Sequence, residues 1–144
     1  MEKIENILQR VEGSKALNSL LKEHRKKSVT VHLENLVGGA LSLYSSALVR
    51  QAGGVHIFVA EDRDTAAYML NDFYALLDEE RVHFFPTSYK RSIIYGKEDA
   101  QGIVQRTNAL NAVRHHRDGY VVICTYPEAI AERVADERAL NERS

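Results

Sequence analysis

Val55-His56-Ile57-Phe58-Val59-Ala60 is the stretch of sequence that decides the fold. It is almost entirely apolar, which is typical of a strand that helices cover on both faces of a sheet. Adjacent glycines, Gly53 and Gly54, are expected to end a helix predicted over residues 41–49, and a second amphipathic helix is predicted over residues 66–77. A buried strand between two helices indicates an α/β protein with a parallel sheet.

Three more segments are predicted to be strands, at residues 29–33, 82–85 and 120–124. The first alternates apolar and polar side chains with period two, and the last is a buried apolar run. We therefore expect a parallel sheet of about four strands with flanking helices. Right-handed crossovers would place any ligand at the carboxyl ends of these strands.

A helical N-terminus is predicted over residues 1–27, interrupted near Gly13 and ended by a basic cluster from Lys22 to Lys27. Residues 1–134 form one domain in this interpretation. The apolar pattern fades afterwards, so residues 135–144 are predicted to be a linker or an artificial end of the chain.

Two local expectations concern the last helices. Thr125-Tyr126-Pro127-Glu128 has the pattern of a capping box with a proline at the first helical turn. A helix with Ile103, Thr107, Leu110 and Val113 in register is expected, and Arg106 and Arg114 are expected at exposed positions of it.

The composition limits the possible functions. A chain of 144 residues with 44% hydrophobic and 27% charged residues can fold as one domain with a core. Its formal net charge of −1 excludes a strongly basic DNA-binding module and leaves only local patches. The sole cysteine, Cys124, lies in an apolar strand and is expected to be a buried thiol in a reducing compartment. We find no apolar stretch long enough for a membrane span or a signal core, and expect a cytoplasmic protein without membrane contact.

The segment Asn35-Leu36-Val37-Gly38-Gly39-Ala40-Leu41-Ser42 lies where a G-x-x-x-x-G-K-[ST] phosphate loop would lie. Asn35 replaces the first glycine, Ala40 the second and Leu41 the lysine, whereas Ser42 keeps its type. Leucine cannot neutralise a phosphate, and Cβ atoms crowd a loop whose N–H groups must face an anion. We interpret the segment as a degenerate phosphate loop that binds no nucleotide.

Two alternatives remain open for this loop. Taken alone, Gly38 and Gly39 are explained more simply as ordinary turn residues. The chain could instead be a nucleotide-binding α/β enzyme domain with an atypical loop. Ser42 would then hold magnesium, and a cation from a later loop would replace the missing lysine: Lys90, Arg91 or Lys97.

The loop after the strand at residues 82–85 is long for a compact α/β unit and is a candidate functional segment. It combines basic and aromatic side chains, as single-strand binders do. The candidate nucleic-acid residues are Tyr89, Lys90, Arg91, Tyr95 and Lys97. A solvated loop is the simpler interpretation of the same residues.

Three histidines, His32, His56 and His83, lie near the starts of predicted strands. Their spacing suggests a zinc site, but no Asp or Cys completes a tetrahedral set. We therefore expect no metal site, and treat the three as partly exposed residues at strand ends.

An ordered set of short motifs resembles a known family. The set comprises Leu36-Val37-Gly38-Gly39-Ala40, Phe58-Val59-Ala60-Glu61-Asp62, Phe84-Phe85-Pro86-Thr87-Ser88-Tyr89, Tyr95-Gly96-Lys97-Glu98-Asp99, Gln105-Arg106-Thr107 and Val121-Val122-Ile123-Cys124-Thr125. In this order they are similar to the N-terminus of bacterial transcription-repair coupling factors (Mfd). The resemblance extends over residues 17–134.

The resemblance implies that residues 1–134 form the first subdomain of a UvrB-like module, a partial RecA-like, P-loop NTPase-type domain that has lost ATP binding. It implies no catalytic residue and no cofactor in this segment. The parent protein would be an ATP-dependent translocase on double-stranded DNA, of the helicase superfamily, that displaces stalled RNA polymerase and recruits UvrA during nucleotide excision repair. ATP and magnesium would belong to its motor domains, and this module would contact other domains of the same chain.

Overall fold

The computed structural model describes residues 2–36, 38–88 and 100–132. Its centre is a parallel sheet of three strands in the order β1-β3-β2. These strands are β1 (Gly54–Val59), β2 (Val82–Phe85) and β3 (Tyr120–Thr125). The α/β class and these three strands are therefore confirmed.

The central strand β3 is buried on both faces. It pairs along its length with β1, and its residues from Val122 to Thr125 pair with β2. Cys124 is fully buried in this strand, as the sequence predicts. Burial raises the pKa of its thiol to about 12, so the sulfur stays protonated and inert at neutral pH.

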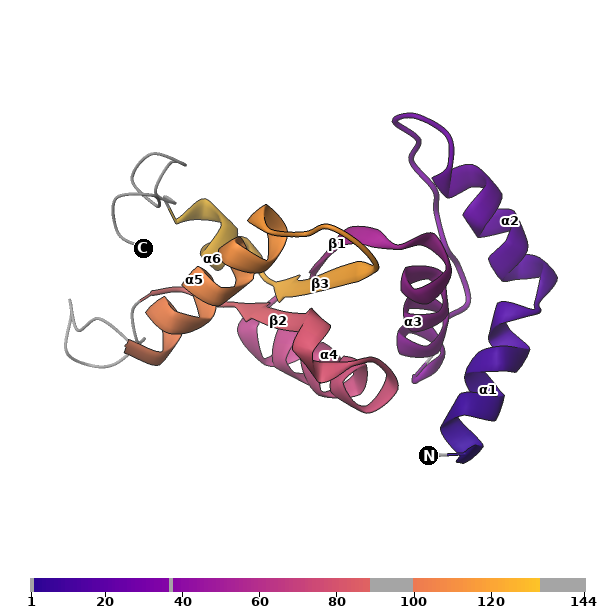
Figure 1. The fold of residues 1–144 in the computed structure, drawn as a ribbon, viewed down its shortest axis with the longest axis horizontal. Coiled ribbons are helices and arrows are strands. Elements are labelled where there is room, and N and C mark those ends of the chain that lie inside the picture. Colours follow the sequence, from indigo (N-terminus) through magenta and orange to yellow (C-terminus); the bar gives the residue numbers. More distant parts are fainter. Residues whose placement is uncertain (1, 37, 89–99, 133–144) are drawn as a thin grey trace.

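Two helices lie on opposite faces of the sheet (Figure 1). Helix α4 (Arg63–Leu76) follows β1, and its Phe73 packs on Phe58 with ring centroids 4.8 Å apart. Helix α5 (Ala100–Arg114) precedes β3 and lies on the other face, beside Ile57. Because the step from β1 to β2 and the step back to β3 run in opposite directions, right-handed crossovers require this arrangement.

The N-terminal helices form a layer beyond the sheet (Figure 1). Helices α1 (Glu2–Glu12) and α2 (Lys15–His24) pack on α3 (Ala40–Ala52), which in turn packs on α4. Leu8 and Leu17 are their buried anchors. The break near Gly13 and the stop at Gly53, which has φ 63°, are confirmed.

The strand predicted at residues 29–33 is wrong, so the sheet of the described residues has three strands rather than about four. Residues 29–36 carry no regular secondary structure, and Leu33 is 52% exposed. Period-two alternation only makes a strand possible, because pairing requires a free sheet edge and a core face for the apolar side chains. Here the side chains of Val29, Val31 and Leu33 are exposed and lack that support.

The predicted capping box is also wrong in its detail. Helix α6 (Pro127–Ala131) has the proline in its first turn as predicted, but its N-cap is Tyr126 and makes no side-chain capping bond. Thr125 belongs to β3, and its hydroxyl donates to the carbonyl oxygen of Phe85 at 2.8 Å. The threonine therefore ties β3 to β2 instead of starting the helix. A short 3-10 turn, η1 (Glu79–Arg81), leads into β2.

Candidate functional site

Residues 35–42, which the sequence analysis interprets as a degenerate phosphate loop, lie at the start of α3. Asn35 and Gly38 have positive φ values of 65° and 61°, and Gly39 is the N-cap of α3 without a side-chain bond. The described residues before the loop form no strand. A phosphate loop normally joins the carboxyl end of a strand to a helix, and this segment lacks the first half of that geometry.

Ser42 has a partner within the protein. Its side chain is only 8% exposed, and its hydroxyl donates to Asp72 Oδ2 of α4 at 2.7 Å. Asp72 lies about 14 Å along α4 from Arg63, which follows the carboxyl end of β1. Ser42 is thus directed toward the far end of α4, away from the sheet edge where ligands of α/β proteins bind.

The five candidate nucleic-acid residues Tyr89, Lys90, Arg91, Tyr95 and Lys97 lie outside the described residues. The structure describes what immediately precedes this loop. There, residues 86–88 lie at the carboxyl edge of the sheet, next to α6.

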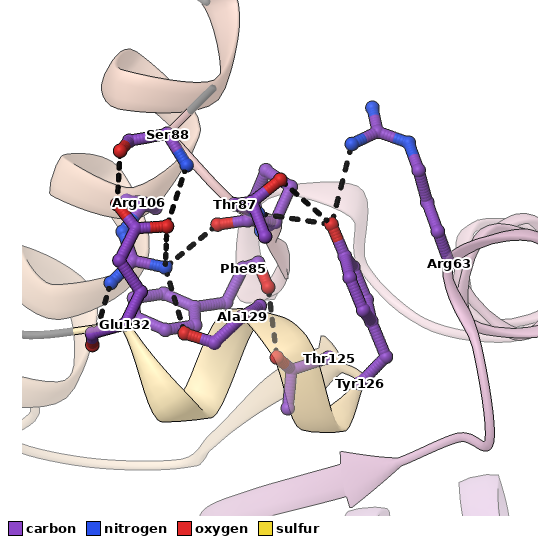
Figure 2. Close-up of polar contacts among 10 residues, drawn as sticks. Arg63, Phe85, Thr87, Ser88, Arg106, Thr125, Tyr126, Ala129 and Glu132 are labelled. Carbon is purple, nitrogen blue, oxygen red and sulfur yellow. Dashed lines mark hydrogen bonds and ion pairs between the residues drawn. The ribbon is translucent and has the colours of Figure 1, made fainter. Parts of the chain in front are cut away.

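Arg106 is the centre of a buried polar network at this edge (Figure 2). The expectation of an exposed arginine is wrong, because its side chain is buried, with the residue only 6% exposed. Its guanidinium donates to the carbonyl oxygens of Pro86 at 2.8 Å and Ala129 at 2.9 Å, and lies 4.1 Å from the ring centroid of Phe85. Glu132 balances the charge, with its carboxylate 3.7 Å from the guanidinium. Helical periodicity alone cannot reveal this, because the partners are carbonyl groups of distant segments.

The other polar groups of this edge are also paired (Figure 2). Glu132 accepts hydrogen bonds from the backbone N–H of Ser88 at 2.9 Å and from its hydroxyl. The hydroxyl oxygen of Tyr126 accepts from the backbone N–H of Thr87 at 2.9 Å and from Arg63 Nη1 at 3.3 Å. Groups that satisfy one another position the chain and leave little capacity for chemistry. This edge therefore fixes residues 86–88 against α6.

The three histidines do not come together. His56 lies within β1, where its Nε2 is 2.6 Å from the carbonyl oxygen of Gly53 and its ring stacks on His24 at 5.7 Å. His83 lies in β2, and His32 is exposed outside any strand. Burial lowers the pKa of both His56 and His83, which keeps them neutral at pH 7. Residues 2–36, 38–88 and 100–132 contain no group of three or more side chains arranged to hold a metal ion.

The feature that sequence reasoning missed is an uncovered apolar face on β1. Val55, Ile57 and Val59 point to the α5 side of the sheet and are exposed, Ile57 by 61%. A strand covered on both faces was expected here, and that expectation is wrong for this side. The face continues into a hollow of about 270 Å³, lined by Ile57, Phe85, Ala109, Leu110, Val113, Ile123, Thr125 and Ile130.

The hollow lies between α5 and β1, because α5 packs mainly on β2 and less on β3. At α6, Ile130 is half-exposed and extends the same apolar surface. The sequence carries no signal for this face, because the apolar pattern of residues 55–60 is the same whether or not a helix covers it. We call the surface formed by Val55, Ile57, Val59, Val113 and Ile130 the open face.

Comparison with family models, curated proteins and solved structures gave no match to this chain. Among the described residues, every helix is too short or too polar to cross a membrane.

Proposed function

We propose that this chain is a non-catalytic, UvrB-like module of a transcription-repair coupling factor. In this proposal it is a RecA-type half-domain with a degenerate phosphate loop, and it acts through contacts with other domains of its own protein. The parent would be the ATP-dependent DNA translocase that displaces stalled RNA polymerase and recruits UvrA in transcription-coupled repair. The ordered motifs from Leu36 to Thr125 support the family, and the open face supports the mode of action.

The open face carries the proposal. Apolar side chains in a contiguous patch gain free energy when another surface removes them from water, at about 25 cal/mol per Å². Half-exposed Val and Ile side chains therefore contribute on the order of 1 kcal/mol each when covered. Such a patch on a small domain marks an interaction site. A module that works by docking needs this surface and needs no catalytic group.

The state of Ser42 also supports a non-catalytic module. A serine that holds magnesium must direct its hydroxyl at the phosphate site, but this hydroxyl is bonded to Asp72. Leu41 offers no charge in place of the missing lysine. The enzyme alternative therefore requires Ser42 to give up its bond with Asp72 before it can hold magnesium.

The experiment that tests the proposal replaces an apolar side chain of the open face with a charge in the longer protein. The variant is Ile57→Glu, and the matched control is Tyr68→Glu, on the α4 side, where the tyrosine is 74% exposed. If docking holds the motor in a resting state, Ile57→Glu raises the basal ATPase rate several-fold and the control leaves it unchanged. If deletion of residues 1–144 leaves basal ATPase and DNA affinity unchanged, the proposal is wrong.

Calorimetry with Mg-ATP tests the nucleotide-binding alternative directly. Loss of the lysine removes a charge-assisted contact worth about 1.5–3 kcal/mol, and the Cβ atoms at both former glycines hinder backbone N–H groups from making contacts of similar size. Even millimolar affinity corresponds to only about −4 kcal/mol, so we expect no measurable binding. A micromolar dissociation constant that is lost on Ser42→Ala would contradict a non-catalytic module.

A further inference from the structure

The C-terminal end of α2 carries a concentrated positive charge that neither the fold nor the proposed function uses. Residues 22–27 hold four Lys or Arg side chains and one carboxylate, a net charge of +3 in a chain whose total is −1. Lys22, Arg25 and Lys27 are exposed, and among the described residues they have no ion pair. Lys26 pairs with Glu23 at 2.8 Å, which uses the one carboxylate of the cluster.

Fold stability does not explain this cluster. One cation at a helix C-terminus is enough to complement the helix dipole, and Lys22 already lies in the last turn of α2. Further like charges within a few residues repel one another and make the free chain less stable. Elsewhere in the fold, arginines are used in contacts: Arg50 pairs with Glu5 and Glu12, and Arg106 with Glu132.

We propose that this cluster, Lys22 with Arg25, Lys26 and Lys27, is a contact site for the phosphate backbone of duplex nucleic acid. It shares no residue with the open face, and it does not depend on the proposed function. The chemistry is the neutralisation of consecutive phosphates by cations on a helix end, which is independent of base sequence.

Two observations favour duplex backbone over an anionic membrane or a single strand. The apolar side of α2 is committed to α3: Leu17 is fully buried and Leu20 and Leu21 are half-buried, so the helix has no apolar surface to insert into a membrane. Residues 15–36 also contain no Phe, Tyr or Trp on which unpaired bases could stack. The cluster itself therefore offers charge, which matches a phosphate backbone, and the exposed Val29, Val31 and Leu33 that follow it belong to no helix that could insert into a membrane.

The test is fluorescence anisotropy of a labelled 20-base-pair DNA with the 144-residue chain, between about 20 and 200 mM salt. Four phosphate contacts predict a slope of log K against log salt of about −3.6. The triple variant Lys22→Ala, Arg25→Ala, Lys27→Ala should bind at least about tenfold more weakly and reduce the slope to about −1.

A charge-matched control removes three other exposed cations, by Arg10→Ala, Lys15→Ala and Arg117→Ala. It should retain most of the affinity, and Lys22→Arg with Lys27→Arg should bind as the original chain does. Circular dichroism confirms that each variant is folded. Equal losses in the two triple variants, or no binding by the original chain, would overturn the proposal. Equal or tighter binding to anionic vesicles or to polyglutamate would identify a different partner and overturn it as well.

Discussion

The two faces of β1 differ in what covers them. On one face Phe58 packs on Phe73 of α4, and His56 is held by the carbonyl oxygen of Gly53 and the ring of His24. On the other face Val55, Ile57 and Val59 alternate along the same strand and are exposed. The same six residues thus form a completed core on one side and an unpartnered surface on the other. Among the described residues, α4 therefore packs on one side of β1, whereas the side that faces α5 stays largely exposed.

The largest effect on stability is expected from the buried network of Arg106 at the carboxyl edge of the sheet. Arg106→Ala removes the only cation that balances Glu132 among the described partners of that carboxylate, and leaves two buried carbonyl groups without their donor. We expect a loss of about 3–5 kcal/mol in the free energy of unfolding, measured by urea denaturation. Arg106→Lys should recover part of this, because lysine keeps the charge but not the two-carbonyl geometry. A loss below about 1 kcal/mol would show that the network does not hold this edge.

The next largest loss of stability is expected at one of two isoleucines that lie side by side. Ile57 and Ile123 are partners in the register of β1 and β3, yet Ile57 is 61% exposed and Ile123 only 5%. Ile123→Ala should cost about 2–4 kcal/mol because it leaves a cavity, whereas Ile57→Ala should cost less than about 1 kcal/mol. Urea denaturation of the 144-residue chain measures both. Equal losses would mean that the open face is covered in solution.

A smaller effect should appear on acidification. Burial lowers the pKa of His56 and His83 from the ordinary value of 6.5. The unfolded chain then binds protons more readily, so the free energy of unfolding should fall as the pH drops below about 6.5 and level off below the folded pKa values. Thermal melting between pH 7.5 and 5 measures this loss of stability. Replacing both histidines with glutamine should make the melting temperature less dependent on pH. A stability that rises in this range would contradict the burial of these rings.

The smallest expected effect is that the thiol of Cys124 does not react in the folded chain. Because burial raises the pKa of Cys124 to about 12, the folded chain should not react with a thiol reagent at pH 8. In urea the same thiol should react fully. Fast labelling under native conditions would show that β3 opens readily.

The sequence predicted those parts of the fold that depend on local pattern. Apolar runs located β1, β2 and β3, and glycines marked the ends of helices, because these signals act within a few residues. The strand predicted at residues 29–33 was wrong because this alternating segment has no partner strand in the described structure. The predicted exposure of Arg106 was wrong because its partners, Pro86 and Ala129, are far away in sequence.

The candidate sites could be predicted less well. That residues 35–42 are a degenerate phosphate loop stays a prediction, and the bond between Ser42 and Asp72 joins residues thirty positions apart and follows only from the packing of α3 on α4. The open face was missed, because an apolar strand looks the same in sequence whether a helix of this segment or another surface covers it. Only the position of α5 over β2 reveals which side of β1 remains free.

If the chain is a module of a longer protein, as we propose, the open face of β1 is covered there by another domain. Single cysteines introduced by Ile57→Cys and, as a control on the α4 side, Tyr68→Cys test it by the rate of maleimide labelling. In the 144-residue chain both positions are exposed and should label rapidly. In the longer protein, Ile57→Cys should label at least about tenfold more slowly while Tyr68→Cys labels as before, because docking that lowers access tenfold corresponds to about 1.4 kcal/mol. Equal, rapid labelling of both positions in the longer protein would contradict the claim.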